Sequence, residues 1–442
     1  MRVGKTHQDI LYEAREENIK FVRLQFVDVL GLPKNVEIPI KRLERALEEG
    51  VNFDGSSIQG FVRIEESDMK LLLDPETFMV CPWEQQDLVA RIICDVTSAE
   101  NTGFEGCPRT NLKRVLNEVA QEGYTFKIGT EAEFFIFQRD EMGKPYTHDR
   151  GSYFDLLPFD QEEKLRRDMV IALDELGFNI EAAHHEVAPG QHEIDFEYSD
   201  ALRVADNLIT LKLAVKTLAI QNGYVATFMP KPMYGVAGSG MHTHLSLFQN
   251  EENAFYDASR EDGLSAVARG FIAGLLQHAP AVTAVTNPLV NSYKRLVPGF
   301  EAPVYVAWAE RNRSPLIRVP PQRGEGTRAE LRNPDPACNP YLAFATILYA
   351  GRDGITKGLD PGKPCNKVNL YEITSEERVA WGIRNLPRNL GEALDEFEKD
   401  QVIREALTPH IVDFYLAAKR SEWEAFQVMV HPWEVERYMD IY

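Results

Sequence analysis

The chain has 442 residues, of which 48 are Lys or Arg and 68 are Asp or Glu, so its formal net charge is −20. Apolar residues make up 44% and charged residues 26%, the mixture of a folded protein of roughly two to three domains. The acidic balance argues against a nucleic-acid-binding surface, and no apolar run approaches the roughly 20 residues that cross a bilayer. We therefore expect no nucleic acid and no membrane as partners.

The cysteines are five in number, widely spaced and without a CxxC pair. This pattern indicates free thiols in a reducing compartment. The first twenty residues carry charges of both signs, unlike a signal peptide. The sequence therefore predicts a cytoplasmic protein. The cysteines are Cys81, Cys94, Cys107, Cys338 and Cys365.

The first hundred residues have the pattern of a small domain of the α+β class. β-Branched and alternating apolar residues predict strands over 21–30, 36–40 and 88–96. A predicted helix over 41–49 ends at Gly50.

A polar, glycine-containing segment at 98–107 separates this region from the rest of the chain. A helix is predicted to open next, at Pro108, with Thr110 as its N-cap. We place a domain boundary at about residue 105, which divides the chain into domains 1–105 and 106–442.

The remainder alternates amphipathic helices with short strands. Gly177 and Gly223 stand where helices commonly end on a glycine. Three long loops rich in Gly and Pro have the character of lids or binding loops. Helices are predicted at 110–121, 161–176, 201–222, 261–279, 338–351 and 408–428, and the loops lie at 140–153, 229–240 and 287–303.

Four predicted strands carry acidic, basic or imidazole side chains on one face. Residues i and i+2 of a strand point the same way, so Glu131 and Glu133 share a face of an otherwise apolar strand. Any one such strand alone is better explained as half exposed, but neighbouring like charges repel unless a cation lies between them. Four of them together predict an antiparallel sheet whose polar face is the active site. The segments are 131–134, 193–197, 242–247 and 328–332.

The candidate ligands favour a hard divalent metal. Several carboxylates with one imidazole and no thiolate suit Mg²⁺ or Mn²⁺ rather than zinc. They are too many for one octahedral ion that keeps its waters, so two or more ions are predicted. His184 and His185 are assigned to packing or to the support of ligands. The candidate ligands are Glu131, Glu133, Glu186, Glu193, His242 and Glu330.

Arginines cluster near these carboxylates in an otherwise acidic chain. A lone arginine is usually a solvated charge, but metals with several arginines are equipped to stabilise a transferring phosphoryl group. Neither GxxxxGK[ST] nor GxGxxG is present, so ATP would be bound through metals and arginines. Arg311, Arg313 and Arg318 follow a predicted strand at 304–309, and Arg328 and Arg332 flank Glu330.

These motifs resemble type I glutamine synthetase over essentially the whole chain. The resemblance implies an N-terminal β-grasp domain and a C-terminal catalytic domain, assembled as a dodecamer of two stacked hexameric rings with active sites between subunits. HPWE at 431–434 resembles the tail that ties the rings together. The other matching segments are FDGSS at 53–57, EAEF at 131–134, HEVAPGQHE at 185–193, GSGMH at 238–242, NSYKRLVPG at 291–299, NRS at 312–314, ELR at 330–332 and DPACNP at 335–340.

The resemblance implies ATP-dependent ligation of ammonia to the γ-carboxylate of L-glutamate through γ-glutamyl phosphate, the reaction of nitrogen assimilation. The residue chemistry agrees with this reaction. The carboxylate is a poor electrophile until it is phosphorylated, and two metals with arginines offset the charge of two anions that meet. A lid must also exclude water from the acyl phosphate.

The resemblance further implies a role for each matching residue. Glu133, Glu186 and Glu193 would hold one ion, and Glu131, His242 and Glu330 the other. Nucleotide contacts would come from Glu181, Tyr198, His244, Ser246, Arg318 and Arg328, and glutamate contacts from Gly238, Arg295 and Arg332. Arg313 would face the transferred phosphate, Glu301 would belong to the closing flap, and Asp54 and Ser57 of the adjacent chain would bind ammonium.

Ala237 departs from the family pattern, which usually has Asn in the glutamate-binding loop. A side-chain contribution to this loop is therefore missing, while the backbone role of Gly238 remains. NLY at 369–371 resembles the loop that is adenylylated in one subgroup but continues differently, so we expect no adenylylation at Tyr371.

GFVRIEES at 60–67 resembles the Gram-positive and archaeal subgroup, in which the position of Arg63 takes part in feedback control. We expect Arg63 to affect the response to effectors such as glutamine or 2-oxoglutarate, and we count regulatory proteins among the expected partners. The alternative is a surface arginine paired with Glu65 or Glu66.

Two other functions fit parts of the pattern. A ligase that joins glutamate to a polyamine or another amine would share the metal and ATP positions, but the presence of Asp54, Ser57 and Glu301 favours ammonia. A non-catalytic homologue would have lost metal carboxylates, and all of them are present.

Overall fold

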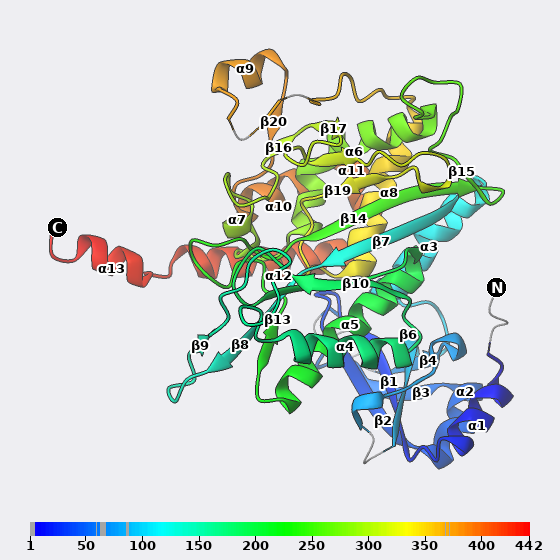
Figure 1. The fold of residues 1–442 in the computed structure, drawn as a ribbon. Helices are drawn as coiled ribbons and strands as arrows, with labels where there is room; N and C mark the ends of the chain where they lie inside the picture. Colours follow the sequence, from blue (N-terminus) through cyan, green and yellow to red (C-terminus); the bar gives the residue numbers. More distant parts are fainter. Residues whose placement is uncertain (1–4, 59, 62–67, 85–87, 367, 371) are drawn as a thin grey trace.

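The computed structural model describes residues 5–58, 60–61, 68–84, 88–366, 368–370 and 372–442. The N-terminal part, in blue, forms a separate unit below the larger remainder of the chain (Figure 1). No helix in the described part of the chain is long and apolar enough to cross a membrane. All five cysteines are buried free thiols, as their number and spacing predicted.

The N-terminal unit is built on a mixed sheet with the strand order β2-β1-β6-β4-β3, and β5 pairs with β6. β1 and β6 run parallel, whereas the other pairs are antiparallel. Apolar side chains of the sheet and of two helices form a core of their own. The elements are α1 His7–Glu16, β1 Phe21–Val27, β2 Pro33–Pro39, η1 Ile40–Arg42, α2 Leu43–Glu49, β3 Val51–Asp54, β4 Asp68–Leu73, η3 Pro75–Thr77, β5 Met79–Val80, η4 Pro82–Glu84 and β6 Val89–Ser98.

The larger unit contains a seven-stranded sheet with the order β12-β7-β14-β19-β18-β17, in which β15 pairs with β14. This sheet is antiparallel apart from the β17–β18 pair. A five-stranded antiparallel sheet has the order β10-β11-β8-β13, and β9 pairs with β8. The strands are β7 Thr125–Ala132, β8 Phe134–Arg139, β9 Pro145–Tyr146, β10 Ile180–His185, β11 Gln191–Phe196, β12 Ser199–Asp200, β13 Val225–Thr227, β14 Met241–Gln249, β15 Glu252–Asn253, β17 Trp308–Glu310, β18 Ile317–Val319 and β19 Ala329–Leu331, with a separate pair β16 Tyr305–Val306 and β20 Arg384–Asn385.

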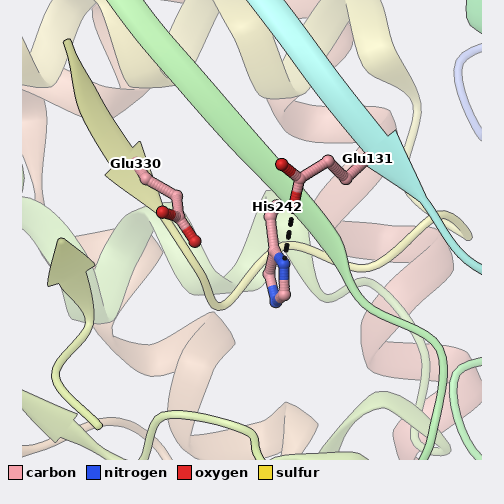
Figure 2. A group of neighbouring side chains, drawn as sticks. All are labelled: Glu131, His242 and Glu330. Carbon is pink, nitrogen blue, oxygen red and sulfur yellow. Dashed lines mark hydrogen bonds and ion pairs between the residues drawn. The ribbon is translucent and has the colours of Figure 1, made fainter. Parts of the chain in front are cut away.

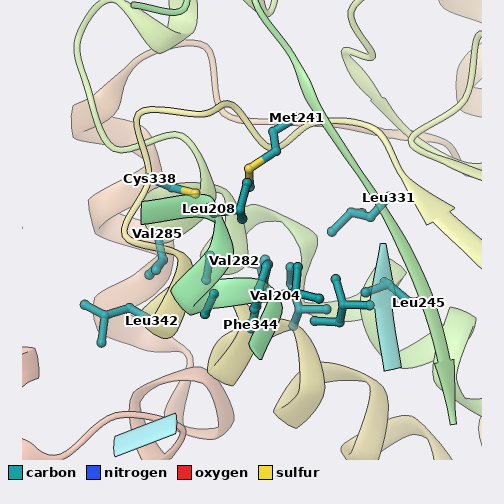
Figure 3. Packing of buried hydrophobic residues seen from close by; sticks show 14 of the residues in the cluster. Val204, Leu208, Met241, Leu245, Val282, Val285, Leu331, Cys338, Leu342 and Phe344 are labelled. Atoms are coloured by element: carbon teal, nitrogen blue, oxygen red, sulfur yellow. The ribbon is translucent and has the colours of Figure 1, made fainter. Parts of the chain in front are cut away.

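Apolar helices cover one face of the seven-stranded sheet. Figure 3 shows Met241 and Leu245 of β14 and Leu331 of β19 packed with side chains from these helices. Alternate residues of a strand point to opposite faces, so the other face of β14 and β19 is left to polar side chains. The helices of the larger unit as a whole are α3 Pro108–Gln121, α4 Glu163–Glu175, α5 Ala201–Gln221, α6 Ala266–Thr286, α7 Ser292–Arg295, η5 Gly324–Gly326, α8 Pro340–Thr356, α9 Ser375–Ala380, α10 Leu390–Lys399, α11 Gln401–Glu405, α12 Pro409–Gln427 and α13 Pro432–Tyr438.

Helices α6 and α8 approach each other closely because both carry glycines at their contact. A Cβ atom on Gly274 would lie 2.0 Å from the carbonyl oxygen of Ala350, and one on Gly354 would lie 2.0 Å from that of Gly270. No side chain fits at these distances, so the two backbones define the spacing of the layer beneath the sheet.

Several predicted element ends are wrong. The N-cap of α3 is Cys107 rather than Thr110, because Pro108 already occupies the first helical position. The helix predicted at 261–279 begins after the N-cap Ser265 and continues through Pro280 to Thr286.

The strand predicted at 21–30 ends at Val27, and the strand predicted at 304–309 is divided into β16 and β17. The glycine helix ends are confirmed, since Gly177 and Gly223 have φ angles of 79° and 80°. The boundary predicted at about residue 105 lies between β6 and α3 and stays a prediction.

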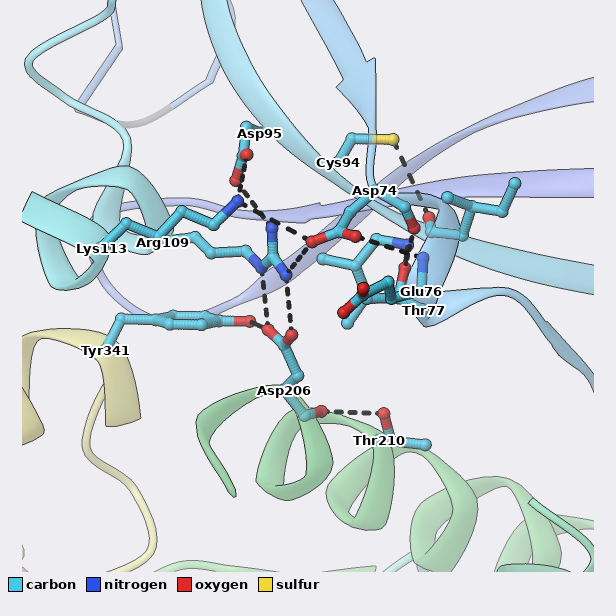
Figure 4. Close-up of polar contacts among 12 residues, drawn as sticks. Asp74, Glu76, Thr77, Cys94, Asp95, Arg109, Lys113, Asp206, Thr210 and Tyr341 are labelled. Atoms are coloured by element: carbon cyan, nitrogen blue, oxygen red, sulfur yellow. Dashed lines mark hydrogen bonds and ion pairs between the residues drawn. The ribbon is translucent and has the colours of Figure 1, made fainter. Parts of the chain in front are cut away.

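Arg109 of α3 joins the two units (Figure 4). Its guanidinium donates to Asp74 at 2.6 Å and to Asp95 at 2.8 Å, both in the N-terminal unit. It also donates to both carboxylate oxygens of Asp206 on α5, at 3.0 and 2.9 Å. Tyr341 of α8 donates to the same carboxylate at 2.6 Å. Since removal of one partner of a buried ion pair is strongly destabilising, this network fixes the units relative to each other.

A buried histidine links α6 and α8 to the junction between α10 and α11. His278 of α6 contacts Asp400 through Nδ1 at 2.6 Å and Asp353 of α8 through Nε2 at 3.1 Å. Burial alone would lower the pKa of His278, but the two carboxylates outweigh it and raise the pKa above its usual value. The stabilisation is therefore complete below the ordinary pKa of about 6.5 and is lost as the pH rises through the raised value.

We expect His278→Gln to lower the thermal unfolding midpoint more at pH 6 than at pH 9. The substitution removes the charge on the ring, which at pH 6 should cost about 1–3 kcal/mol of unfolding free energy. Thermal unfolding of both proteins, followed at several values between pH 6 and 9, measures this difference. An equal shift at every pH would show that the ring contributes packing alone.

Candidate active site

Strand β14 brings together one group of predicted metal ligands. Its pairing with β7 places His242 opposite Glu131, and its pairing with β19 places His244 opposite Glu330. Glu131, His242 and Glu330 each offer one ligand atom, and these atoms lie within 4.8 Å of one another (Figure 2). We call these three residues the first cluster.

Two imidazoles donate hydrogen bonds to Glu131. His242 donates to it through Nδ1 at 3.1 Å and His244 through Nε2 at 2.6 Å. Burial raises the pKa of Glu131, but these hydrogen bonds outweigh burial and hold the pKa below its usual range. Arg328 donates to Nδ1 of His244 at 3.3 Å, so the proton of this ring lies on Nε2. His244, predicted as a nucleotide contact, therefore also supports the first cluster.

Glu330 is buried between two arginines. Arg318 donates to its Oε2 at 2.5 Å, and Arg332 donates to its Oε1. Burial opposes ionisation, but the charge of Arg332 and its neighbours holds the pKa of Glu330 below its ordinary value. The sequence pattern indicated Arg328 and Arg332 as the flanking pair. Arg318 takes the place of Arg328 because β18 lies beside β19, a neighbour that strand spacing does not reveal.

The predicted continuous strand through Glu131 and Glu133 is wrong. β7 ends at Ala132 in the seven-stranded sheet, and β8 begins at Phe134 in the five-stranded sheet. Glu133 lies at this junction, where its Oε2 accepts from the backbone N–H of Gly240 at 2.9 Å. The break sends neighbouring carboxylates toward different groups of ligands.

Carboxylates crowd together beyond this junction. His184, Glu193 and Asp195 have ligand atoms within 4.8 Å of one another, and Nε2 of His184 lies 3.2 Å from Glu193. Burial and the charge of Asp195 hold the pKa of Glu193 well above its usual value. Burial and the charge of Glu133 raise the pKa of Glu186 to about 8. We call Glu133, Glu186, Glu193 and Asp195 the second cluster.

The donor chemistry of both clusters fits hard divalent ions. The second cluster consists of oxygen ligands that repel one another, and a bound cation removes this repulsion. The first cluster adds one imidazole to two carboxylates, which also suits Mg²⁺ or Mn²⁺.

The two adjacent histidines of β10 serve these clusters in different ways. His185 is fully buried, with Nε2 at 2.9 Å from Asp149 and Nδ1 at 2.6 Å from the carbonyl oxygen of Glu186. His184 faces Glu193 on the opposite side of the strand. Both positions fit the predicted supporting role.

The predicted glutamate-binding positions meet beside Glu133. A Cβ atom on Gly238 would lie 2.3 Å from the carbonyl oxygen of Pro230, so this loop position requires glycine. A Cβ atom on Gly240 would lie 2.5 Å from Nη2 of Arg295, which places that guanidinium against the loop. Arg295 also donates to the carbonyl oxygen of Arg332 at 3.1 Å.

The predicted nucleotide positions border the first cluster. Tyr198 is exposed. A Cβ atom added to Gly129, the residue of β7 that pairs with His244, would lie 3.2 Å from the Cβ of Tyr198. Ser246 lies on the same face of β14 as His244 and is buried, whereas Glu181 on β10 is exposed.

Arg313 and Glu301 lie near the second cluster. Burial and the charge of Glu186 raise the pKa of Tyr153, and Arg313 opposes this shift, so Arg313 and Glu186 flank the same hydroxyl. The charge of Glu301 contributes to the raised pKa of Glu186. Glu301 is exposed and has a φ angle of 57°, an uncommon conformation that often occurs in functional loops.

The predicted ammonium positions lie elsewhere. Asp54 ends β3 in the N-terminal sheet, and both Asp54 and Ser57 are exposed. The N–H of Ser56 donates to Asp54 at 2.8 Å, a local turn contact that this carboxylate makes within its own loop. Figure 1 shows β3 apart from β14 and β19. Arg63 and Tyr371 lie outside the described residues.

Sequence reasoning did not identify two residues of the site. Asp195 follows Glu193 at strand spacing, and this pattern could have included it among the ligands. Gln191 contacts Glu133 and the carbonyl oxygen of Gly238, but an amide after a turn carries no recognisable ligand signal.

Comparison with known proteins identifies the family. Residues 105–438 match the model "Glutamine synthetase, catalytic domain", and residues 18–99 match "Glutamine synthetase, beta-Grasp domain". The chain is 52% identical to glutamine synthetase of Methanosarcina mazei, with 100% of this chain and 99% of the relative covered. It is 54% identical to that of Thermus thermophilus, with 100% of both chains covered.

Solved structures agree with these matches. A GmaS/ADP complex has a TM-score of 0.89 and 33% identity, with 98% of this chain and 99% of that chain covered. Glutamine synthetase of Plasmodium falciparum has a TM-score of 0.88 and 28% identity, with 99% of both chains covered. The chain therefore belongs to the glutamine synthetase family, as its motifs predicted.

Proposed function

We propose that this chain joins ammonia to the γ-carboxylate of L-glutamate at the polar face of the seven-stranded sheet, through γ-glutamyl phosphate. ATP-dependent synthesis of glutamine from glutamate and ammonia is the activity of its family. The observation that carries the proposal is the grouping of Glu131, His242 and Glu330, with Arg318 and Arg332 on the same carboxylate. Cations are concentrated where two anionic substrates have to meet.

The two clusters would hold two divalent ions. The first cluster would bind one, and Glu133, Glu186 and Glu193 would bind the other, with Asp195 beside them. When bound, Mg²⁺ or Mn²⁺ offsets phosphate charge and polarises the transferred phosphoryl group.

The residues around the clusters would bind and orient the substrates. A γ-carboxylate oxygen of glutamate attacks the terminal phosphorus of ATP, the bond to ADP breaks, and γ-glutamyl phosphate forms. Arg313 would stabilise the charge on the phosphoryl group, and the loop of Glu301 would exclude water. ATP would contact Glu181, Tyr198, His244, Ser246, Arg318 and Arg328, and glutamate would contact Gly238, Arg295 and Arg332.

Ammonia then attacks the carbonyl carbon and phosphate leaves. Asp54 would bind ammonium and accept its proton, with Ser57 beside it. Because β3 lies apart from the clusters in one chain, we place Asp54 of a neighbouring chain at each site, in a dodecamer of two hexameric rings. Helix α13 projects from the body of the chain, and Trp433 and Met439 are exposed, which suits contact with another chain (Figure 1).

Phosphate release tests the reaction and its acceptor. We expect release to require ATP, Mg²⁺ and glutamate, and ammonia to support it better than methylamine or a polyamine. Preference for one of the amines would assign the chain to the related ligases. Regulation by glutamine or 2-oxoglutarate through Arg63 stays a prediction from the sequence.

We predict that Glu330→Gln lowers kcat at least about a hundredfold at saturating Mg²⁺. The substitution removes the charge of a carboxylate that is both a candidate metal ligand and the partner of two arginines. Steady-state kinetics measure the change, and size-exclusion chromatography checks the assembly. Glu252→Gln is the matched control, since Glu252 is exposed on β15 of the same sheet. Activity of Glu330→Gln close to that of the control would remove Glu330 from the metal site.

We predict that mixed oligomers of Glu330→Gln and Asp54→Asn recover activity at low ammonium, where each variant alone is nearly inactive. If Asp54 comes from the neighbouring chain, about a quarter of the sites in a random 1:1 assembly combine an intact Asp54 with an intact Glu330. The chains are unfolded together, reassembled and assayed, with separately reassembled variants as controls. No recovery in verified mixed oligomers would mean that each chain supplies its own Asp54.

A further inference from the structure

Gln191 forms the start of β11 and is fully buried at the centre of the site. Its Nε2 donates to Oε2 of Glu133 at 2.7 Å and to the carbonyl oxygen of Gly238 at 3.2 Å. Its Oε1 accepts from the N–H of Ala188 at 3.1 Å. Both N–H bonds and the oxygen of the carboxamide are thus used, so the amide plane has one favourable orientation.

Glu133 is tied to the glutamate loop by a second route. Its Oε2 also accepts from the N–H of Gly240 at 2.9 Å, and its own N–H donates to the carbonyl oxygen of Gly240 at 3.0 Å. A displacement of the Glu133 carboxylate therefore acts on the loop at Gly238 through Gln191 and at Gly240 directly.

The backbone of the loop around Gly238 has little conformational freedom of its own. Gly238 can carry no side chain beside Pro230, and the N–H of Ser239 donates to the carbonyl oxygen of Pro230 at 2.8 Å. Ala237 provides no polar side chain that could hold the loop. The Gln191 amide is a direct side-chain link between Gly238 and the second cluster.

We propose that Gln191 is a positioning residue that couples the divalent ion on Glu133 to the binding of glutamate at the Gly238 loop. The proposal rests on the proposed function, which places an ion on Glu133 and glutamate on this loop. An ion that draws Glu133 into one position fixes the amide and hence the Gly238 carbonyl. Coupling of two binding equilibria is reciprocal, so glutamate must tighten the ion to the same degree.

Calorimetric titration of glutamate into the full-length oligomer, without metal and with saturating Mn²⁺, tests this coupling. In the unchanged protein we expect Mn²⁺ to lower the Kd of glutamate. The coupling factor is the ratio of the glutamate Kd without Mn²⁺ to the Kd with saturating Mn²⁺. In Gln191→Met, which keeps the length of the side chain but removes both donors, we expect this coupling factor to shrink about tenfold. A factor equal to that of the unchanged protein would overturn the proposal, as would the absence of any Mn²⁺ effect in the unchanged protein.

Two further variants keep the test decisive. Gln191→Asn keeps an amide but is one methylene shorter, so its donors no longer reach both Glu133 and the Gly238 carbonyl oxygen. It should lose coupling too, and it decides the matter if Gln191→Met does not fold. His278→Gln perturbs a buried contact remote from the site and should keep the full factor. Equal loss of coupling in this control would indicate general loosening and overturn the proposal.

Failure of the proposed function gives a different result. In that case the unchanged protein would show no glutamate-dependent phosphate release. If the unchanged protein does release phosphate, and Mn²⁺ changes the glutamate Kd of Gln191→Met as much as that of the unchanged protein, only the coupling role of Gln191 is rejected.

Discussion

Repulsion between buried carboxylates is the constraint around which the catalytic unit is organised. In the first cluster the protein itself supplies the compensating groups, because imidazoles donate to Glu131 and arginines enclose Glu330, and both pKa values lie below their usual range. In the second cluster the pKa values of Glu186 and Glu193 are raised. There the neighbouring carboxylates repel one another, and a bound cation would remove this repulsion, so the charge balance of the second cluster would depend more strongly on metal than that of the first.

The fold makes this arrangement possible by separating apolar from polar faces. Met241 and Leu245 face the helices beneath β14, so His242 and His244 emerge on the opposite side. The break between β7 and β8 then directs Glu131 and Glu133 toward different clusters, although one residue separates them. One interruption of a strand thus separates the two groups of candidate ligands.

Much of this site could be predicted from local sequence patterns, since strand spacing identified the polar face and the candidate ligands, and the family resemblance grouped Glu131, His242 and Glu330. The remainder depends on which strands become neighbours. Arg318 reaches Glu330 because β18 pairs with β19, and Gln191 reaches Glu133 because β11 pairs with β8. Register between distant segments has no signature within either segment. The same holds for the end of β7 at Ala132, where the apolar run continues and only the change of sheet marks the break.

The position of Asp54 connects the fold to the assembly. Arg109 is 4% exposed and holds Asp74, Asp95 and Asp206 together, so the N-terminal sheet cannot turn freely against its own catalytic unit. Movement of β3 to the clusters of the same chain would require this buried guanidinium to lose its partners. A second chain can bring Asp54 to the clusters without that cost. The rigidity of the junction within one chain is therefore the physical reason to expect a site completed between chains.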